Sequence, residues 1–234
     1  MNILAIDTST ELFSVGISTC AGDFCIDADA GTSQSELLLD ALDALTRLAS
    51  IEREEIDIFT CMRGPGSFTG LRIGFAAVKG LALSLGKRMI SVPTLDCAAH
   101  SFARGNFLCV PVLDARQKRF FSALYRGGKR LGDFMDCTAE ELSQHIKKNL
   151  DNEPAAPRVT LFCGGGAALA FDTLSGLLPD VCVLADEARR GGASALLQYV
   201  KKSCMLNNME DARFSAPLYI RKSDAEIKRE AGGN

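Results

Sequence analysis

Apolar residues along the chain fall into two alternating kinds of segment. Short apolar runs bounded by polar or glycine-rich turns predict buried strands, among them ILAID, IDIFTCM, FLCVPVL and VTLFC. Longer stretches follow a helical period, and the clearest of these runs from Ser35 to Ser50. The alternation of strands with helices predicts an α/β fold.

The same order of elements occurs twice along the chain. ILAIDTST and FSVGIS predict an antiparallel strand pair that is followed by alternating helices and strands, and after Arg104 a second hairpin, FLCVPVL and FFSALY, begins the same pattern again. Two similar α/β halves around a cleft are typical of the actin-like/Hsp70-like (ASKHA) fold. We therefore expect an N-terminal α/β domain over 1–103 and a second, smaller α/β domain over 104–215. A C-terminal tail over 216–234 is expected to pack back and to end exposed.

Composition and charge restrict the class of protein. The chain has 234 residues, 47% hydrophobic and 24% charged, which is an ordinary globular mixture. Its formal net charge of −3 argues against strong nucleic-acid binding by this chain on its own. No apolar stretch has the length of a membrane span, and the start MNILAIDTS has no basic residues typical of a signal peptide. We expect a cytoplasmic protein.

The nine cysteines support the same localisation. None are spaced as C-x-x-C, and most lie inside apolar runs such as TLFCGGG, which is typical of small buried side chains in a reducing compartment. A zinc site is the alternative, but no pair has a suitable ligand spacing. We expect no metal site.

The turn after the first strand is a candidate for phosphate binding. Asp7 ends this strand, where an actin-like phosphotransferase holds a metal–phosphate group. Ser9, however, stands where a glycine would let the backbone approach a phosphate. The favoured alternative is an Asx turn, in which Asp7 accepts hydrogen bonds from backbone N–H groups.

A glycine-rich loop, RGPGSFTGLRIG, is the second candidate. Its four glycines precede a helix, yet it matches neither G-x-x-x-x-G-K-[ST] nor G-x-G-x-x-G. A weak anion or nucleotide site would comprise Asp7, Ser9, Arg63, Gly64, Gly66, Ser67 and Thr69. The simpler interpretation is a tight turn that aims the following helix, with Ser67 or Thr69 as its cap. A glycine turn in CGGGAA is equally consistent with a tight turn or an approach to adenosine.

Two helices of the first half are more apolar than a surface helix requires. In the helix from Ser35 to Ser50, apolar side chains span an arc of about 160°, compared with about 100° for a surface helix. In the next predicted helix, Gly74, Ala77 and Gly80 form a face without bulk. We infer a subunit interface, the alternative being a tightly packed intramolecular pair. The residues assigned to this interface are Leu38, Leu42, Leu45, Leu71, Gly74, Phe75, Ala77, Val78, Gly80 and Leu81.

Catalytic residues are not evident in the sequence. The two histidines, His100 and His145, belong to separate predicted helices, and neither forms an H-x-x-x-H or H-E-x-x-H pair. This pattern argues against a histidine-based nucleophilic triad and against a zinc peptidase. We expect no catalytic residue in this chain.

Several motifs together resemble one family. ILAIDTST…FSVGIS, GPGSFTGLRIG, SVPTLDCAA, VLDARQKRFFSALY and PLYIR follow one another as in the TsaB family, also called YeaZ, and the resemblance covers nearly the whole chain. It implies a non-catalytic partner of TsaD that acts with TsaD and the ATPase TsaE. That complex forms threonylcarbamoyladenosine next to the anticodon of tRNAs reading A-starting codons. TsaD has an H-x-x-x-H metal pair that is absent here.

The resemblance also implies partners and cofactors. It implies a heterodimer with TsaD through the two N-terminal helices, a homodimer when the chain is alone, and contact with tRNA only through the complex. It implies no intrinsic cofactor, since ATP is used by partner proteins, although a nucleotide at the subunit junction is an alternative. The family commonly has His-Ser where this chain has Gln34-Ser35, so a proton-dependent role there is in doubt. An actin-like small-molecule kinase or ATPase and an M22-type glycoprotease-like peptidase stay as alternative functions.

Overall fold

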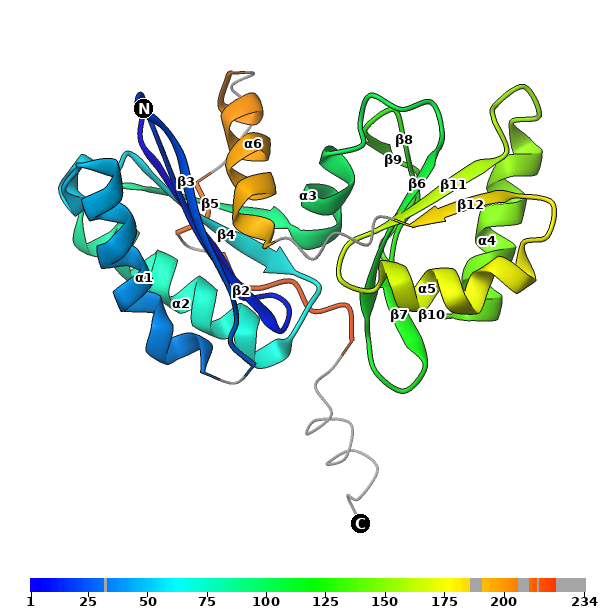
Figure 1. The fold of residues 1–234 in the computed structure, drawn as a ribbon, viewed down its shortest axis with the longest axis horizontal. Coiled ribbons are helices and arrows are strands. Elements are labelled where there is room, and N and C mark those ends of the chain that lie inside the picture. The colour runs from blue at the N-terminus through cyan, green and yellow to red at the C-terminus, as the bar shows by residue number, and fades with distance from the viewer. Residues whose placement is uncertain (32, 186–190, 206–210, 214, 222–234) are drawn as a thin grey trace, which may run out of the picture.

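The computed structural model describes residues 1–31, 33–185, 191–205, 211–213 and 215–221. These residues form two α/β lobes that lie side by side (Figure 1). Lobe I is built on a five-stranded sheet and lobe II on a seven-stranded sheet. No helix in these ranges has both the length and the apolar character needed to cross a membrane.

Lobe I contains the first hairpin and its parallel neighbours. Its sheet has the order β3-β2-β1-β4-β5, with bounds β1 (Ile3–Asp7), β2 (Leu12–Thr19), β3 (Gly22–Asp29), β4 (Ile58–Gly64) and β5 (Arg88–Pro93). β1 pairs antiparallel with β2 and parallel with β4. A short helix η1 (Arg53–Glu55) precedes β4, and α3 (Thr94–His100) follows β5.

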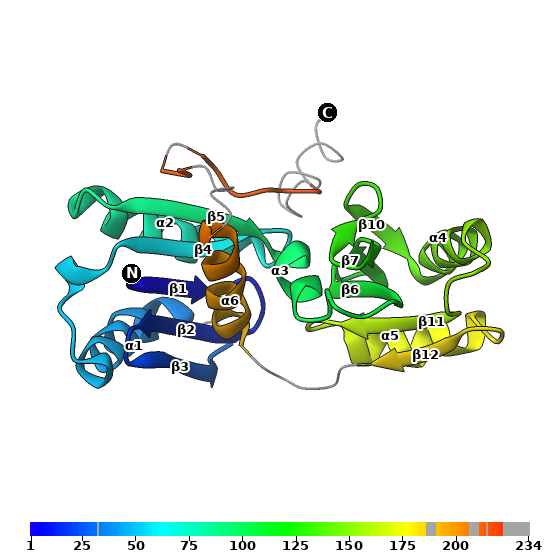
Figure 2. The ribbon, with the colours of Figure 1, turned by 90° about the horizontal axis from the view of Figure 1, so that it is seen from above.

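Helices cover both faces of this sheet. α1 (Gln34–Ala49) and α2 (Phe68–Ser84) lie on one face, and α6 (Gly192–Met205) lies on the other (Figures 1 and 2). Successive side chains of a strand point to opposite faces, so Leu4 and Ile6 pack with α1 and α2, whereas Ile3 and Ala5 pack with α6. Burial on both faces explains why β1 is a continuous apolar run.

Lobe II repeats this arrangement. Its main path has the order β10-β7-β6-β11-β12, while β8 pairs with β6 and β9. The strands are β6 (Leu108–Asp114), β7 (Arg119–Ser122), β8 (Tyr125–Arg126), β9 (Lys129–Arg130), β10 (Met135–Thr138), β11 (Val159–Cys163) and β12 (Cys182–Ala185). The helices are α4 (Ala139–Asn152), α5 (Ala167–Leu174) and η2 (Ser175–Leu177). The shared strand order confirms the two similar α/β halves that are expected of the actin-like fold.

The predicted start of α4 is confirmed. Thr138 Oγ1 accepts a hydrogen bond from the Glu141 backbone N–H at 3.3 Å, and Glu141 Oε2 accepts one from the Thr138 N–H at 2.8 Å. This reciprocal pair is a capping box, which satisfies two N–H groups at the helix start.

The predicted domain boundary is wrong for α6. The range assigned to the second domain, 104–215, includes this helix, but α6 packs on the sheet of lobe I. Its apolar face, including Leu196 and Leu197, is fully buried together with Ile3 and Ala5. Residues 211–213 also belong to lobe I, since the Ala212 N–H donates to the Met89 carbonyl oxygen at 2.7 Å.

The segment 215–221 spans the two lobes. In lobe I the Leu218 N–H donates to the Arg63 carbonyl oxygen at 2.7 Å, and in lobe II Arg221 Nη2 donates to the Ala115 carbonyl oxygen at 2.7 Å. These contacts confirm that the tail packs back as far as Arg221. Its predicted exposed end, 222–234, lies outside the described residues.

Candidate functional site

The turn after β1 is stabilised from within the chain. Asp7 is buried, and its Oδ1 accepts hydrogen bonds from the Ser9 N–H at 2.8 Å and from the Ser9 hydroxyl at 2.6 Å. The Gly192 N–H at the start of α6 donates to the same carboxyl group. Burial raises the pKa of Asp7 above its ordinary value of 3.8, although these hydrogen bonds oppose the shift. The Asx turn is therefore confirmed.

The first N–H groups of α6 occupy the space next to Asp7. Asp27 Oδ2 accepts a hydrogen bond from the Gly191 N–H at 3.1 Å, and Ser14 Oγ accepts one from the Ala193 N–H at 3.1 Å. A Cβ atom at Gly192 would collide with the Asp7 carboxyl group. Since a helix start leaves several N–H groups unpaired, these side chains act as its caps. The polar atoms of Asp7 and Ser9 thus bind protein groups, which favours a structural role over a phosphate-binding one.

The glycine-rich loop packs directly against the β1–β2 turn. A Cβ atom at Gly66 would lie 2.5 Å from the Ser9 carbonyl oxygen, and one at Gly70 would collide with the Thr8 carbonyl oxygen. The Ser67 N–H also donates to the Ser9 carbonyl oxygen at 2.7 Å. These glycines therefore let two backbone segments approach each other, which is the tight-turn interpretation.

The remaining loop residues have separate roles. Ser67 caps α2 as predicted, because its Oγ accepts a hydrogen bond from the Gly70 N–H at 3.2 Å. Gly64 has a φ of 114° and lies against the Leu218 carbonyl oxygen, whereas Thr69 is exposed in the first turn of α2. Arg63 is half-buried, and its Nε has no hydrogen-bond partner within the described ranges. Of the residues assigned to this site, the structure brings Ser9, Gly66 and Ser67 into direct contact.

Turns of the two lobes meet directly. Arg116 Nη2 after β6 donates to Glu11 Oε1 before β2 at 2.6 Å. Thr10 lies beside Gly165, where a Cβ atom would be 3.7 Å from the Thr10 methyl carbon. Gln34 Nε2 donates to the Thr10 carbonyl oxygen at 2.7 Å, which gives Gln34 a structural role at the start of α1. The β1–β2 turn of lobe I is therefore in contact with the turns after β6 and β11 of lobe II.

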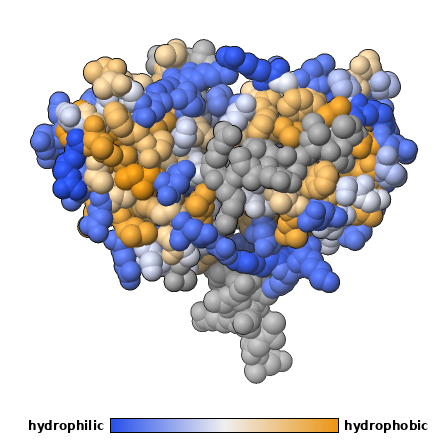
Figure 3. All heavy atoms as spheres, in the orientation of Figure 1, coloured by the Kyte–Doolittle hydropathy of each residue, from blue (hydrophilic) through white to orange (hydrophobic). Residues whose placement is uncertain are grey.

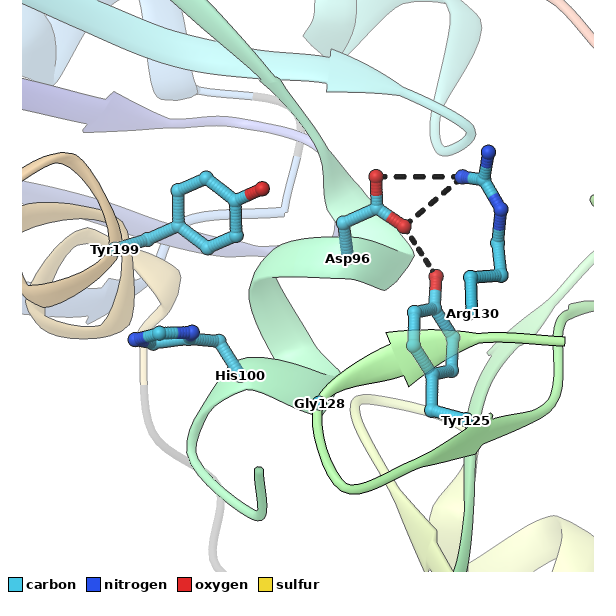
Figure 4. Close-up of a pocket in the computed structure, with 6 residues that line it drawn as sticks. All are labelled: Asp96, His100, Tyr125, Gly128, Arg130 and Tyr199. Carbon is cyan, nitrogen blue, oxygen red and sulfur yellow. Dashed lines mark hydrogen bonds and ion pairs between the residues drawn. The ribbon is translucent and has the colours of Figure 1, made fainter. Parts of the chain in front are cut away.

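A pocket of about 210 Å³ lies at another part of the lobe junction, between α3, α6 and the β8–β9 hairpin (Figure 4). It is lined by Asp96, His100, Tyr125, Gly128, Arg130 and Tyr199. Asp96 Oδ1 accepts hydrogen bonds from the Tyr125 hydroxyl at 2.5 Å and from Arg130 Nη1 at 3.0 Å. The carboxylate is thus neutralised by lobe II, and the contact joins α3 to the hairpin.

Two further side chains of this pocket belong to the lobe I side. The Tyr199 hydroxyl points toward Asp96 in Figure 4, and burial raises the pKa of Tyr199. The His100 ring contacts the Tyr199 ring at a centroid distance of 5.0 Å. Burial, together with the positive charge of Lys202, lowers the pKa of His100. Only His100 was singled out from the sequence, because no local motif marks the other residues.

An apolar surface covers α1 and α2. It comprises the exposed leucines Leu37 and Leu48 of α1 and Leu83 of α2, together with the exposed Gly80, and we call it the α1–α2 surface. Leu48 is 62% exposed, and a Cβ atom at Gly80 would meet nothing within 4 Å. Figure 3 shows apolar side chains gathered over these two helices at the left of the molecule.

Most residues assigned to the interface from the sequence are not on this surface. The assignment is wrong for six large side chains that are at most 6% exposed in the core of lobe I, namely Leu38, Leu42, Leu45, Leu71, Phe75 and Val78. It is also wrong for Gly74, which is buried against the Thr8 hydroxyl. Ala77 and Leu81 are partly buried against the core, and only Gly80 is exposed. The sheet covers the centre of each apolar arc and leaves its edges free.

Comparison with known proteins places this chain in a family. The profile of the TsaD family, described as tRNA N6-adenosine threonylcarbamoyltransferase, matches residues 28–229. The tRNA threonylcarbamoyladenosine biosynthesis protein TsaB of Bacillus subtilis (strain 168) is 25% identical over 232 residues, which cover 97% of each chain. The Escherichia coli (strain K12) protein of the same name is 33% identical over 131 residues, 54% of this chain and 55% of that protein. The chain belongs to the TsaB/YeaZ family.

Solved structures agree with the TsaB/YeaZ fold. YeaZ from Pseudomonas aeruginosa superposes with a TM-score of 0.74 at 23% identity, covering 94% of this chain and 99% of that one. The ethanolamine utilization protein EutJ from Carboxydothermus hydrogenoformans has a TM-score of 0.50 at 12% identity, covering 80% and 85%. Across the described residues of this TsaB/YeaZ chain, no three His, Cys, Asp or Glu side chains are grouped so as to hold a metal ion.

Proposed function

We propose that this chain is a scaffold and activating subunit of the complex that forms threonylcarbamoyladenosine next to the anticodon of tRNAs reading A-starting codons. Its partners would be TsaD, bound through α1 and α2, and the ATPase TsaE, and a second copy of the chain would replace TsaD when the chain is alone. The names of the TsaB relatives support the pathway. The single structural observation that carries the proposal is the exposed α1–α2 surface.

The geometry of the α1–α2 surface suits a pair of partner helices. Leu37 and Leu48 are eleven residues apart, so at about 100° per residue they lie within about 20° of each other on α1. On α2, Leu83 stands about one turn from Gly80, where a partner backbone can approach closely. Exposed leucines grouped in this way mark an interaction site more often than a solvated surface. A TsaD-family partner has a related fold and can present the equivalent helices.

The proposal assigns the chemistry to the partner. The Asp7 carboxyl group accepts hydrogen bonds from Gly192 of α6 and from Ser9, and Arg116 donates to Glu11 between the turns of the two lobes. These contacts support a chain without a catalytic residue or a resident cofactor. In this proposal any nucleotide binds at the junction with the partner.

Reconstitution tests the proposal. Unmodified tRNA would be incubated with TsaD and TsaE from the same genome, ATP and the threonylcarbamoyl donor, with and without this chain. Mass spectrometry of the tRNA nucleosides would then measure threonylcarbamoyladenosine. We expect product only when the chain is present, and none from the chain with tRNA and donor alone. Equal product formation in its absence, or product formation by this chain alone, would contradict the proposal.

A further inference from the structure

The start of α2 and the C-terminal segment bring an arginine and two aromatic rings together at the surface. The Arg72 guanidinium lies over the Phe68 ring, 3.9 Å from its centroid, and Arg72 Nε donates to the Tyr219 hydroxyl oxygen at 3.3 Å. The Phe68 and Tyr219 ring centroids are 4.7 Å apart. Phe68 and Arg72 are about one turn apart on α2, whereas Tyr219 comes from the segment that spans the lobes. The arginine is therefore held from two sides.

Arg72 is positioned but not neutralised. In the part of the chain that the structure describes, no carboxylate forms an ion pair with it. A guanidinium has five N–H donors, of which the Tyr219 hydroxyl takes one. Because the ring and the hydroxyl already restrict this side chain, an anion that binds it loses less free energy to side-chain ordering than at a mobile arginine. The remaining donors are available to an anion.

Further cations continue from this cluster to lobe II. Arg221 follows Tyr219 by two residues, which is at most about 7 Å of extended chain. It binds the Ala115 carbonyl oxygen and forms an ion pair with Asp136, and Arg116 is paired with Glu11 and Asp114. The residues after Ala115 form an exposed turn in which Arg116, Gln117 and Lys118 have φ values of 62°, 54° and 59°. Three successive non-glycine residues in this region are costly and point to a functional constraint.

Three cations along this path have no carboxylate partner among the described residues. Lys118 at the tip of the turn and Arg63 beside Leu218 have no ion pair with any described carboxylate, as is true of Arg72. The chain as a whole has a net charge of −3. We call Arg63, Arg72, Lys118 and Tyr219 the cationic edge.

We propose that the cationic edge binds the phosphate backbone of the RNA substrate, with a base stacked on the exposed part of the Tyr219 ring. The inference rests on the proposed function for the identity of the RNA. Tyr219 is 39% exposed, and an aromatic ring beside unpaired cations suits a strand in which bases and phosphates alternate. An acidic protein segment would pair with the cations but would not account for the exposed Tyr219 ring beside them. The net negative charge predicts weak binding by the isolated chain and stronger binding in the assembly.

RNA affinity tests this inference directly. Fluorescence anisotropy would follow a labelled, unmodified tRNA anticodon stem-loop with the isolated chain at low ionic strength and with the chain bound to TsaD. We expect Arg72→Gln and Lys118→Gln each to weaken binding about three- to tenfold. Each should also reduce the slope of log affinity against log salt by about 0.7 to 1. Tyr219→Ala should weaken binding about fivefold or more through lost stacking.

Arg104→Gln is the matched control. Arg104 is exposed, has no ion pair with a described carboxylate, and precedes β6, whereas the Lys118 turn follows the other end of that strand. Its substitution should leave RNA affinity unchanged. Lys118 lies at the tip of an exposed turn, so Lys118→Gln should remain folded even if Arg72→Gln does not.

The outcomes separate this inference from the proposed function. Unchanged affinity and slope in both Arg72→Gln and Lys118→Gln would overturn it, as would absence of RNA binding by chain and assembly. If these variants bind TsaD more weakly but bind RNA like the parent, the cationic edge contacts an acidic protein surface. That result would also overturn the inference of RNA binding. RNA binding by the isolated chain is measured without a partner. If the variants weaken RNA binding as expected but the chain is not needed for tRNA modification, only the proposed function is contradicted.

Discussion

Asp7 is a buried carboxyl group whose hydrogen bonds do not fully compensate for its removal from water. Ser9 and Gly192 donate to it, yet burial outweighs these bonds and raises its pKa above 3.8. The folded protein consequently holds the Asp7 proton more tightly than the unfolded chain does. The stabilisation linked to this proton is complete below about pH 3.8. It is lost as the pH rises through the raised pKa.

Asp7→Asn removes this titration and makes the effect measurable. The variant has a lower free energy of unfolding at every pH, because a side-chain amide has one accepting oxygen and one NH2 group. The NH2 group cannot accept a hydrogen bond, so either Ser9 or Gly192 loses its acceptor. Urea unfolding at several pH values between about 4 and 7 would give the free energy of unfolding of both proteins. We expect the stability of the variant relative to the parent to improve as the pH rises. A difference that stays constant with pH, or that moves the other way, would contradict the buried and raised Asp7.

Local signals predicted part of this turn. An aspartate followed by serine after a strand predicts an Asx turn, and Ser67 before a helix predicts a cap, because both depend on neighbours in sequence. The third donor to Asp7 could not be predicted in this way. Gly192 is 185 positions further along the chain, and only packing of α6 brings it to the turn.

Helix α2 shows how packing distinguishes residues that are equivalent in sequence. Gly74 and Gly80 both lie inside this helix, and the sequence places them on one small-residue face. In the structure, a Cβ atom at Gly74 would collide with the Thr8 hydroxyl, whereas one at Gly80 would be in open space. Helical periodicity gives the width of an apolar arc, but it does not show which edge the sheet covers.

This difference predicts opposite effects of the same substitution. Gly80→Ala should stabilise the protein by about 0.5–1 kcal/mol, because alanine costs less backbone entropy in a helix interior. Gly74→Ala should destabilise it by about 1–3 kcal/mol, since Thr8 or the helix must move. The free energy of unfolding in urea would measure both. Similar effects of the two substitutions would show that α2 does not pack against the β1–β2 turn as described.

At the scale of the whole molecule, the repeated strand order predicted two lobes but not the position of α6. Its place in the sequence, after the last strand of lobe II, suggested that it belongs there. Its apolar face is instead buried on Ile3 and Ala5 of lobe I, because that side of the first sheet needs a cover. The short strands β8, β9 and β10 were also missed, since two- to four-residue segments carry little periodicity.

The candidate sites also divide into one that the sequence predicted and others that only the folded structure shows. The sequence identified α1 and α2 as interface helices, and the structure leaves an exposed apolar surface on both. It did not identify the pocket around Asp96 or the cluster of Arg72 and Tyr219. Those residues come from separate elements, so only the folded chain shows that they are neighbours.

The most direct test of the α1–α2 surface is the affinity of this chain for TsaD after a single charge is placed on it. Leu83→Glu on α2 and Leu169→Glu on α5 form a matched pair, because both leucines are 48% exposed and only Leu83 belongs to the α1–α2 surface. Neither change should affect folding by more than about 0.5 kcal/mol. Binding to TsaD would be measured by isothermal titration calorimetry. We expect Leu83→Glu to weaken binding about tenfold or more and Leu169→Glu to bind like the parent. Parent-like binding by Leu83→Glu, or equal losses in both variants, would contradict the assignment of this surface to the partner.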